Sequence, residues 1–259
     1  MSNFKLPEPK YNIELIVQGK QHFYDVTYKG ITTRYSGVTG ILSVINKPAL
    51  INWAKREALS LVEDTLLKRL NGRKSARITL NRTWIDALLT DAKKRPETLK
   101  EEAADLGTQA HAFIDLIIHG VEPTQIPEEI SAPVNSFKDW WKNSGIQLIA
   151  GDTKVASIEY GYGGSLDALG IRNGELVVLD WKTGSGIYLE YALQVAAYAQ
   201  AFYETYGIEC KSAVIVRFGK KPPIEFEKKE VLDLKQTFEA FLAAKQLKEM
   251  LSKTHFIEW

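Results

Sequence analysis

Two aspartates and a lysine lie around one predicted β-hairpin and together could form a catalytic site. Asp180 follows Asp167 by thirteen residues, and Lys182 stands two residues after Asp180. Asn173-Gly174 predicts a two-residue turn, which leaves each acid six residues from the turn and therefore opposite the other. Asp180 and Lys182 share one face of their strand. Two carboxylates suit a divalent cation such as Mg²⁺, and a lysine beside it could assist an attacking water, so these residues could cleave a phosphodiester.

A helix predicted at about residues 189–206 could bring two more polar side chains to the hairpin. Gln194 and Tyr198 are four residues apart and therefore share a helix face. Gln194 could bridge to the lysine or to a phosphate, and Tyr198 could bond to a nucleic-acid backbone or stack on a base. Two plainer interpretations stay open, namely an ordinary cross-strand pair of acids beside a solvated Lys182, and a Tyr198 that belongs to the core.

Two further candidates precede the hairpin in the sequence. Glu159 comes eight residues before Asp167, on a strand predicted over 154–160. His111 lies on a helix that Pro96 is predicted to open and that carries acids early, where they suit the helix dipole. The plainer alternatives are a solvated glutamate and a structural histidine.

In sequence order, these residues resemble the signature of the PD-(D/E)XK nuclease superfamily, in its RecB-like branch. Five motifs in the correct order and with sensible spacing make the resemblance specific, although each alone is weak. Over residues 36–54 the chain is also similar to phage-encoded exonucleases and, more distantly, to the mitochondrial genome maintenance exonuclease. The five motifs, within roughly residues 100–218, are Gly107 with His111, Glu159, Gly164 with Asp167, Asp180 with Lys182, and Gln194 with Tyr198.

The resemblance implies a mixed α/β fold with a restriction-endonuclease-like core, in which helices flank a central mixed β-sheet and a helical N-terminal part is added. It implies hydrolysis of DNA with Mg²⁺ or Mn²⁺ as the cofactor. The implied metal ligands are His111, Asp167, Asp180 and the carbonyl of Trp181. The implied catalytic residues are Lys182 as the catalytic lysine, Asp167 and Asp180, with Glu159, Gln194 and Tyr198 in support.

The pattern along the chain predicts two regions. Residues 1–99 are expected to hold short strands over 11–36, a short helix ending near residue 45 and a helix over 48–67. Residues 100–259 are expected to form the nuclease core. In that core the sequence predicts helices at about 128–144, 189–206 and 231–251, and strands at 146–150, 154–160, 164–171, 175–181 and 211–218.

The N-terminal region carries a local excess of positive charge that could hold strand phosphates. Trp53 or Trp84 could stack on bases, and the region could form a channel or arch for DNA. A solvated loop is the alternative. Between residues 68 and 95, two Asp stand against nine cationic residues, namely Lys68, Arg69, Arg73, Lys74, Arg77, Arg82, Lys93, Lys94 and Arg95.

The composition excludes several classes of protein. The chain has 259 residues, of which 45% are hydrophobic, and its net charge of +1 provides no global attraction to nucleic acid. Its single cysteine, Cys210, excludes an internal disulfide and the Fe–S cluster that some relatives carry. The sequence contains no phosphate-binding loop motif, no apolar run of membrane-spanning length and no signal peptide. We therefore expect no built-in ATPase, no membrane association and a cytoplasmic location in a bacterial or phage-infected host cell.

These observations predict a stand-alone, metal-dependent deoxyribonuclease that acts in DNA replication, recombination or repair. A narrow channel roofed by helices would favour single strands and free ends, and hence exonuclease action, by analogy with the mitochondrial enzyme. Two alternatives remain. One is a structure-specific or double-strand endonuclease of the same fold, and the other is a catalytically silent DNA-binding accessory protein.

Overall fold

The computed structural model describes residues 4–70, 79–184, 186–219 and 226–253. The chain divides into two compact units, one formed by the residues up to Ile45 together with those from Gln109 onward, and the other by Asn46–Thr108. The first 45 residues therefore group with the segment that carries the predicted hairpin. The predicted boundary at residue 99 falls within one long helix, α3 (Arg82–Ile118).

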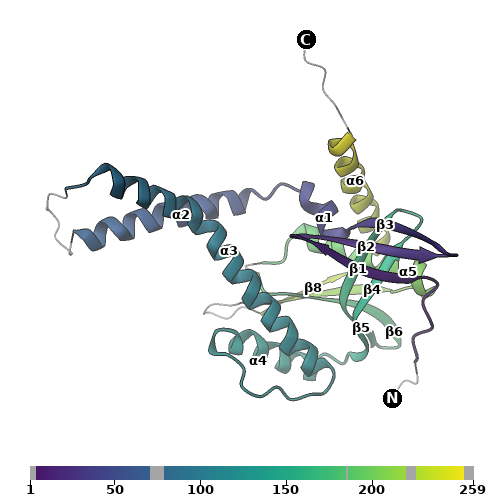
Figure 1. Ribbon diagram of the computed structural model, residues 1–259. Coiled ribbons are helices and arrows are strands. Elements are labelled where there is room, and N and C mark those ends of the chain that lie inside the picture. The colour runs from purple at the N-terminus through teal and green to yellow at the C-terminus, as the bar shows by residue number, and fades with distance from the viewer. Residues whose placement is uncertain (1–3, 71–78, 185, 220–225, 254–259) are drawn as a thin grey trace, which may run out of the picture. The chain divides into compact units, whose positions relative to one another are not determined.

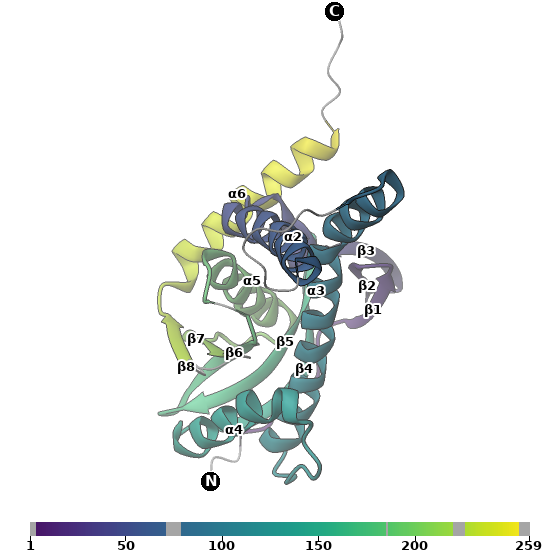
Figure 2. The same cartoon turned by 90° about the vertical axis from the view of Figure 1, so that its left-hand side faces the viewer.

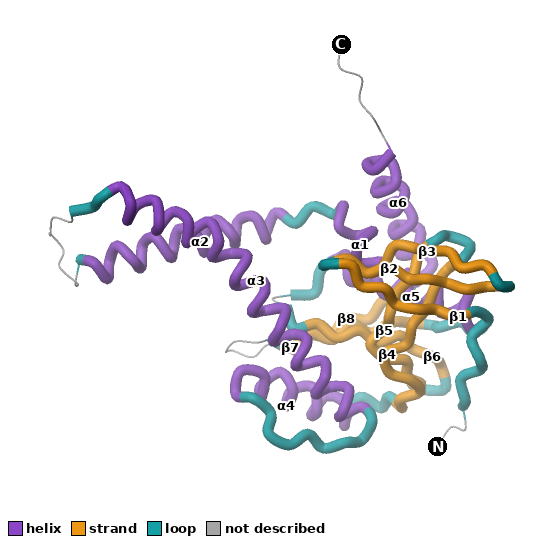
Figure 3. Tube along the Cα trace, in the orientation of Figure 1, coloured by secondary structure: helices purple, strands orange, loops and turns teal. Residues whose placement is uncertain are grey.

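An eight-stranded mixed sheet forms the centre of the larger unit (Figures 1 and 3). Its strands follow the order β1-β2-β3-β5-β6-β7-β8, and β4 pairs with the other edge of β5. The β3–β5 and β6–β7 pairs are parallel and the others are antiparallel. The strands are β1 (Asn12–Gln18), β2 (Gln21–Tyr28), β3 (Ile31–Gly37), β4 (Gln147–Ser157), β5 (Tyr162–Arg172), β6 (Glu175–Lys182), β7 (Ser212–Phe218) and β8 (Phe226–Val231).

Helices cover both faces of this sheet (Figure 2). On one face, α5 (Leu189–Tyr206) and α6 (Leu234–Lys253) bury a core with β5, β6 and β7. On the other, α4 (Glu128–Asn143) and the end of α3 bury a second core around Phe137. Because β6 and β7 are covered on both sides, their sequences are almost continuously apolar. The predicted mixed α/β architecture is confirmed.

The connection between β6 and β7 positions the predicted helix with Gln194 and Tyr198. Strand β6 ends at Lys182, α5 begins at Leu189, and β7 returns parallel to β6. Such a crossover packs its helix back onto the sheet. The helix predicted at 189–206 is thus confirmed, and it lies on the face of β6 that carries Val178 and Asp180.

The smaller unit is helical and differs from the sequence prediction in one respect. Helix α2 (Pro48–Arg69) begins at the predicted proline, but α3 begins at Arg82, well before Pro96, which lies inside it. The side chain of Asn81 accepts a hydrogen bond from the Trp84 N–H at 2.8 Å, and this capping contact starts the helix earlier. The prediction that Pro96 opens the helix was wrong.

The predicted base-stacking tryptophan Trp84 already has a partner in this unit. The guanidinium of Arg69 lies 4.6 Å from the centre of the Trp84 ring and donates to the Thr79 carbonyl oxygen at 3.3 Å. The exposed cations Lys93, Lys94 and Arg95 follow on α3. Three members of the predicted basic segment, Arg73, Lys74 and Arg77, lie outside the described residues.

Other differences concern short elements. The strands predicted at 146–150 and 154–160 form a single strand, β4, whose pairing with β5 shifts between Leu148 and Ala150. Strand β8 was not predicted, and the short helix before residue 45 consists of α1 (Val38–Ile41) and a 3₁₀ turn, η1 (Leu42–Val44). Within the described residues, no helix has the length and apolar character needed to cross a membrane.

Candidate active site

The β5–β6 hairpin has the predicted turn and register. Asn173 and Gly174 both have positive φ, at 54° and 85°, as a tight two-residue turn requires. The last pair in the register joins Ala168 to Leu179. One step further along both strands, Asp167 stands opposite Asp180. The spacing from Asn173-Gly174 therefore predicted this juxtaposition correctly.

Asp180 and Lys182 form a buried ion pair at the end of β6. Asp180 is 1% exposed, and Lys182 Nζ lies 2.5 Å from Asp180 Oδ2. Apart from this ion pair, Asp180 Oδ2 has no hydrogen-bond partner among the described residues. A buried carboxylate oxygen in this state is costly unless another cation joins it.

The protonation of this pair is shifted by its surroundings. Burial raises the pKa of Asp180 to about 7, the ammonium of Lys182 opposes the rise, and the carboxylate of Asp167 adds to it. Burial also disfavours the charged form of Lys182, but the two carboxylates outweigh that effect and raise the pKa of the lysine. Lys182 therefore keeps its proton beside Asp180 at neutral pH.

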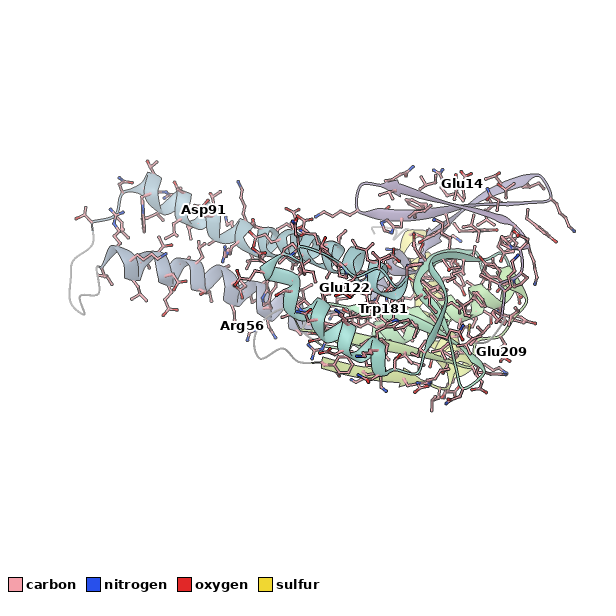
Figure 4. All side chains as sticks on the ribbon, turned by 90° about the horizontal axis from the view of Figure 1, so that it is seen from below. Glu14, Arg56, Asp91, Glu122, Trp181 and Glu209 are labelled. Carbon is pink, nitrogen blue, oxygen red and sulfur yellow. The ribbon has the colours of Figure 1, made fainter. Side chains whose placement is uncertain are left out.

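Asp167 links the hairpin to helix α3. Its Oδ2 accepts a hydrogen bond from the Trp181 N–H at 2.6 Å, and its Oδ1 lies 3.8 Å from His111 Nδ1. The structure thus brings His111 and Asp167 together from segments far apart in the sequence. The side chain of Trp181 is buried among the aromatic residues of α4 on the other sheet face (Figure 4). Its contribution to a metal site would come from the main-chain carbonyl.

Gln194 and Tyr198 lie against the same face of the hairpin. Gln194 Nε2 donates to Tyr198 Oη at 2.6 Å. Burial, reinforced by the charge of Asp180, raises the pKa of Tyr198 well above its ordinary value. Tyr198 is 4% exposed, and its ring belongs to the core. The alternative of a core tyrosine therefore holds, and the prediction that Tyr198 stacks on a base was wrong.

Gly164 has a steric reason that the motif alone does not reveal. A Cβ atom at this position would lie 2.3 Å from Tyr198 Cε1, far inside van der Waals contact. The absence of a side chain on β5 therefore lets the Tyr198 ring approach the strand beside Asp167. The neighbouring Gly163 makes room for Tyr24 in the same way, because a Cβ atom at Gly163 would lie 2.4 Å from Tyr24 Cγ.

The structure does not bring Glu159 to this group. Glu159 lies in the turn between β4 and β5 and not on a strand, and its N–H donates to the Glu204 carboxylate at 3.2 Å. The turn starts after Ser157, which pairs with Tyr162. Asp167 is five residues further along β5, about 16 Å at the rise of a strand. The prediction that Glu159 lies on a strand was wrong, because β4 ends at Ser157, and its supporting role in catalysis stays a prediction.

Two residues that the sequence reasoning missed lie at the site. Tyr191 is one turn before Gln194 on α5, and its ring centre is 4.9 Å from Lys182 Nζ. Asp152 lies on β4 between the Gly151–Ala168 and Thr153–Leu166 pairs, so its main chain is level with Asp167, although its positive φ of 33° departs from strand geometry. The helical spacing of Tyr191 with Gln194 could have identified it. Asp152 stood in a gap between two predicted strands.

Arg217 is a third missed residue and stands next to Lys182 in the register of β6 and β7. It is buried, and its Nε donates to Glu227 Oε2 of β8 at 3.0 Å. Its Nη1 donates to the Gly184 carbonyl oxygen at 3.4 Å. Arg217, paired with Glu227, thus holds the main chain at Gly184, two residues after Lys182. Because β8 was not predicted, no sequence pattern indicated that Glu227 would pair with Arg217.

The predicted metal ligands can be tested against their chemistry. Among the described residues, no group of three or more His, Cys, Asp or Glu side chains has the spacing of a metal site. The oxygen donors nevertheless suit a hard divalent cation, since Asp180 Oδ2 is buried without a hydrogen bond and Asp167 lies across from it. His111 adds an imidazole beside Asp167. The residues therefore fit a cation after modest side-chain rearrangement.

Comparison with known proteins agrees with the sequence signature. The family model described as "PD-(D/E)XK nuclease superfamily" matches residues 85–258. None of the curated proteins matches the chain significantly. The matched segment contains all of the predicted site residues.

Three solved structures to which the chain is similar share little of its sequence. SSO0001 is 17% identical with a TM-score of 0.31, and the match covers 46% of this chain and 57% of SSO0001. A putative exonuclease from Eubacterium rectale is 12% identical with a TM-score of 0.35, and the match covers 73% of this chain and 74% of the exonuclease. An alkaline exonuclease from Laribacter hongkongensis is 13% identical with a TM-score of 0.27, and the match covers 57% of this chain and 82% of the exonuclease.

Proposed function

Because this chain belongs to the PD-(D/E)XK nuclease superfamily, we propose that it is a metal-dependent deoxyribonuclease of the RecB-like branch that hydrolyses DNA phosphodiester bonds. One observation carries the proposal. Asp167, Asp180 and Lys182 converge at the end of β6, and a buried oxygen of Asp180 is left without a hydrogen bond among the described residues. A structural ion pair alone would not require a second carboxylate beside this one.

Members of this superfamily generally use divalent metal ions, and we propose Mg²⁺ or Mn²⁺ here. Asp167 and Asp180 would hold the ion, with His111 and the Trp181 carbonyl as further ligands. Such an ion supplies a lowered pKa for water and charge stabilisation at phosphate oxygens. Lys182 keeps its proton and places an ammonium where negative charge develops on the phosphate. Gln194 and Tyr198 would support the site, since Tyr198 lies near Asp180 and its hydroxyl accepts a hydrogen bond from Gln194.

The proposal includes an exonuclease mode with a preference for single strands or free ends, in DNA replication, recombination or repair. The basic helical segment of residues 46–108 is proposed to bind strand phosphates. Its described cations Lys93, Lys94 and Arg95 are exposed, as salt-dependent contacts to the DNA backbone would require.

Digestion of labelled DNA tests the proposed function. We expect linear single-stranded DNA, labelled at each end in turn, to be shortened from an end in the presence of Mg²⁺ or Mn²⁺. A circular single strand should stay intact. Cutting of the circle would instead favour the endonuclease of the same fold. Binding of DNA without cleavage under either metal would contradict the nuclease proposal and favour the accessory protein.

Metal binding should be visible in stability as well as in activity. We expect Mg²⁺ or Mn²⁺ to raise the Tm of the wild-type protein, since a ligand at 100 times its Kd contributes about 2.7 kcal/mol to the free energy of unfolding. The rise should be larger at about pH 8 than at about pH 5.5, because below its pKa of about 7 Asp180 holds a proton that competes with the ion. Differential scanning fluorimetry measures both.

Matched variants assign that effect to the site. Asp180→Asn and Asp167→Asn should abolish the metal-dependent rise in Tm. Asp139→Asn, at an exposed position on α4, should keep it. An equal rise in all three variants would show that the ion binds elsewhere.

A further inference from the structure

Two tyrosines lie between the partly buried Lys182 and the solvent. The ring of Tyr191 lies 4.9 Å from Lys182 Nζ, and the ring of Tyr188 meets it edge to face with centres 5.7 Å apart. Tyr188 itself is 41% exposed. The chain thus presents one aromatic side chain to solvent within two contacts of the proposed catalytic group.

The position of Tyr188 is not explained by the start of helix α5. Tyr188 is the N-cap residue of α5, yet its side chain makes no capping hydrogen bond. Ser, Thr, Asp and Asn are the residues that stabilise this position. An exposed tyrosine there forgoes that stabilisation, which favours a role in recognition.

The orientation of the ring is supported from two sides. Tyr191 contacts it with an edge-to-face geometry at an interplanar angle of 69°. A Cβ atom at Gly186 would lie 3.6 Å from Tyr188 Cζ, which is ordinary van der Waals contact, so Gly186 lies beside the ring. A supported ring loses little conformational freedom when a ligand stacks on it.

The location suits a ligand of the proposed reaction. Tyr188 lies in the short connection from β6 to α5, at the carboxyl end of two parallel strands, where open α/β sheets bind ligands. An unpaired nucleobase exposes its face for stacking on an aromatic side chain, whereas a paired base within a duplex stacks on its neighbours.

We propose that Tyr188, supported by Tyr191, is a stacking site for an unpaired nucleobase next to the phosphodiester that reaches Lys182. The inference deepens the proposed function and rests on it. Stacking of one base on an aromatic side chain contributes about 1–3 kcal/mol, or roughly 5- to 150-fold in affinity. The site reads the single-stranded state of the substrate and not its sequence.

Binding and cleavage by Tyr188→Ala, Tyr188→Phe and Tyr203→Ala test the proposal. Tyr203 is the matched control, because it is 49% exposed on the same helix but lies at its far end. We expect Tyr188→Ala to raise the Kd for a fluorescent single-stranded oligonucleotide, measured with a chelator present, by roughly 5- to 150-fold. KM with Mn²⁺ should rise similarly and kcat should change less. Tyr188→Phe and Tyr203→Ala should behave like the wild type.

An abasic oligonucleotide separates stacking from a structural effect. Removing one base at a time along the strand should identify a position at which the wild type loses affinity and Tyr188→Ala loses nothing more. An unchanged Kd and KM for Tyr188→Ala, an equal loss in Tyr203→Ala, or a loss that no abasic position reproduces would each overturn the stacking site. If the wild type binds but does not cleave DNA while Tyr188→Ala loses affinity, the nuclease proposal fails and the stacking site stands.

Discussion

Replacing Lys182 with methionine is expected to lower the rate of DNA cleavage by at least about 100-fold, the usual effect of removing one preorganised group that stabilises transition-state charge. Lys182 holds its proton between Asp180 and the ring of Tyr191, so its ammonium is fixed before the substrate arrives. Methionine keeps the length of the buried stem and removes only the charge. Single-turnover digestion of end-labelled DNA with Mn²⁺ measures the loss.

Two measurements keep this result interpretable. Removing the ammonium leaves Asp180 buried with one charge fewer beside it, so the Tm of the variant must be determined and the assay run well below it. Lys211→Met is the matched control, because Lys211 is exposed beside Glu209 and outside the site. Near wild-type cleavage by Lys182→Met would remove this lysine from the mechanism, while equal losses in both variants would indicate a nonspecific effect of charge.

The parts of this site that the sequence predicted depend on local rules. The Asn173-Gly174 turn fixes the register of its own hairpin, so the positions of Asp167 and Asp180 follow from counting residues. The shared face of Gln194 and Tyr198 follows from helix geometry. Each of these predictions needs only one local motif, a hairpin or a helix, and the regular spacing of residues within it.

The parts that the sequence did not predict depend on contacts between elements. The parallel pairing of β6 with β7, which places Arg217 beside Lys182, is set through a helical crossover, and no turn specifies its register. Tyr191 is an ordinary helix residue until α5 packs on the hairpin. The predicted position of Glu159 differs for a local reason, because the chain turns at residues 158–161, where the sequence pattern predicts that the strand continues.

Replacing Gly164 with alanine is expected to lower the Tm of the protein by roughly 2–12 °C. Overpacking of a buried site costs about 1–3 kcal/mol, and each kcal/mol shifts the Tm of a domain of this size by about 2–4 °C. The new Cβ would come within 2.3 Å of Tyr198 Cε1. Because the ring is enclosed in the core, relief requires movement of α5 relative to β5, which would also move Gln194 away from the site. Thermal unfolding followed by circular dichroism measures the change.

A second substitution identifies the cause of that loss. In a Tyr198→Ala background, Gly164→Ala should cost little further stability, because the ring that the new Cβ meets is gone. Gly40→Ala is the matched control, since a Cβ in that helix would meet nothing within 4 Å. A wild-type Tm for Gly164→Ala would contradict the close approach of strand and ring. Equal losses in both backgrounds would place the strain elsewhere. The glycine of the Gly-X-X-Asp motif therefore acts through packing, since it lets the tyrosine of the Gln-X-X-X-Tyr motif bring α5 close to the acids and the lysine.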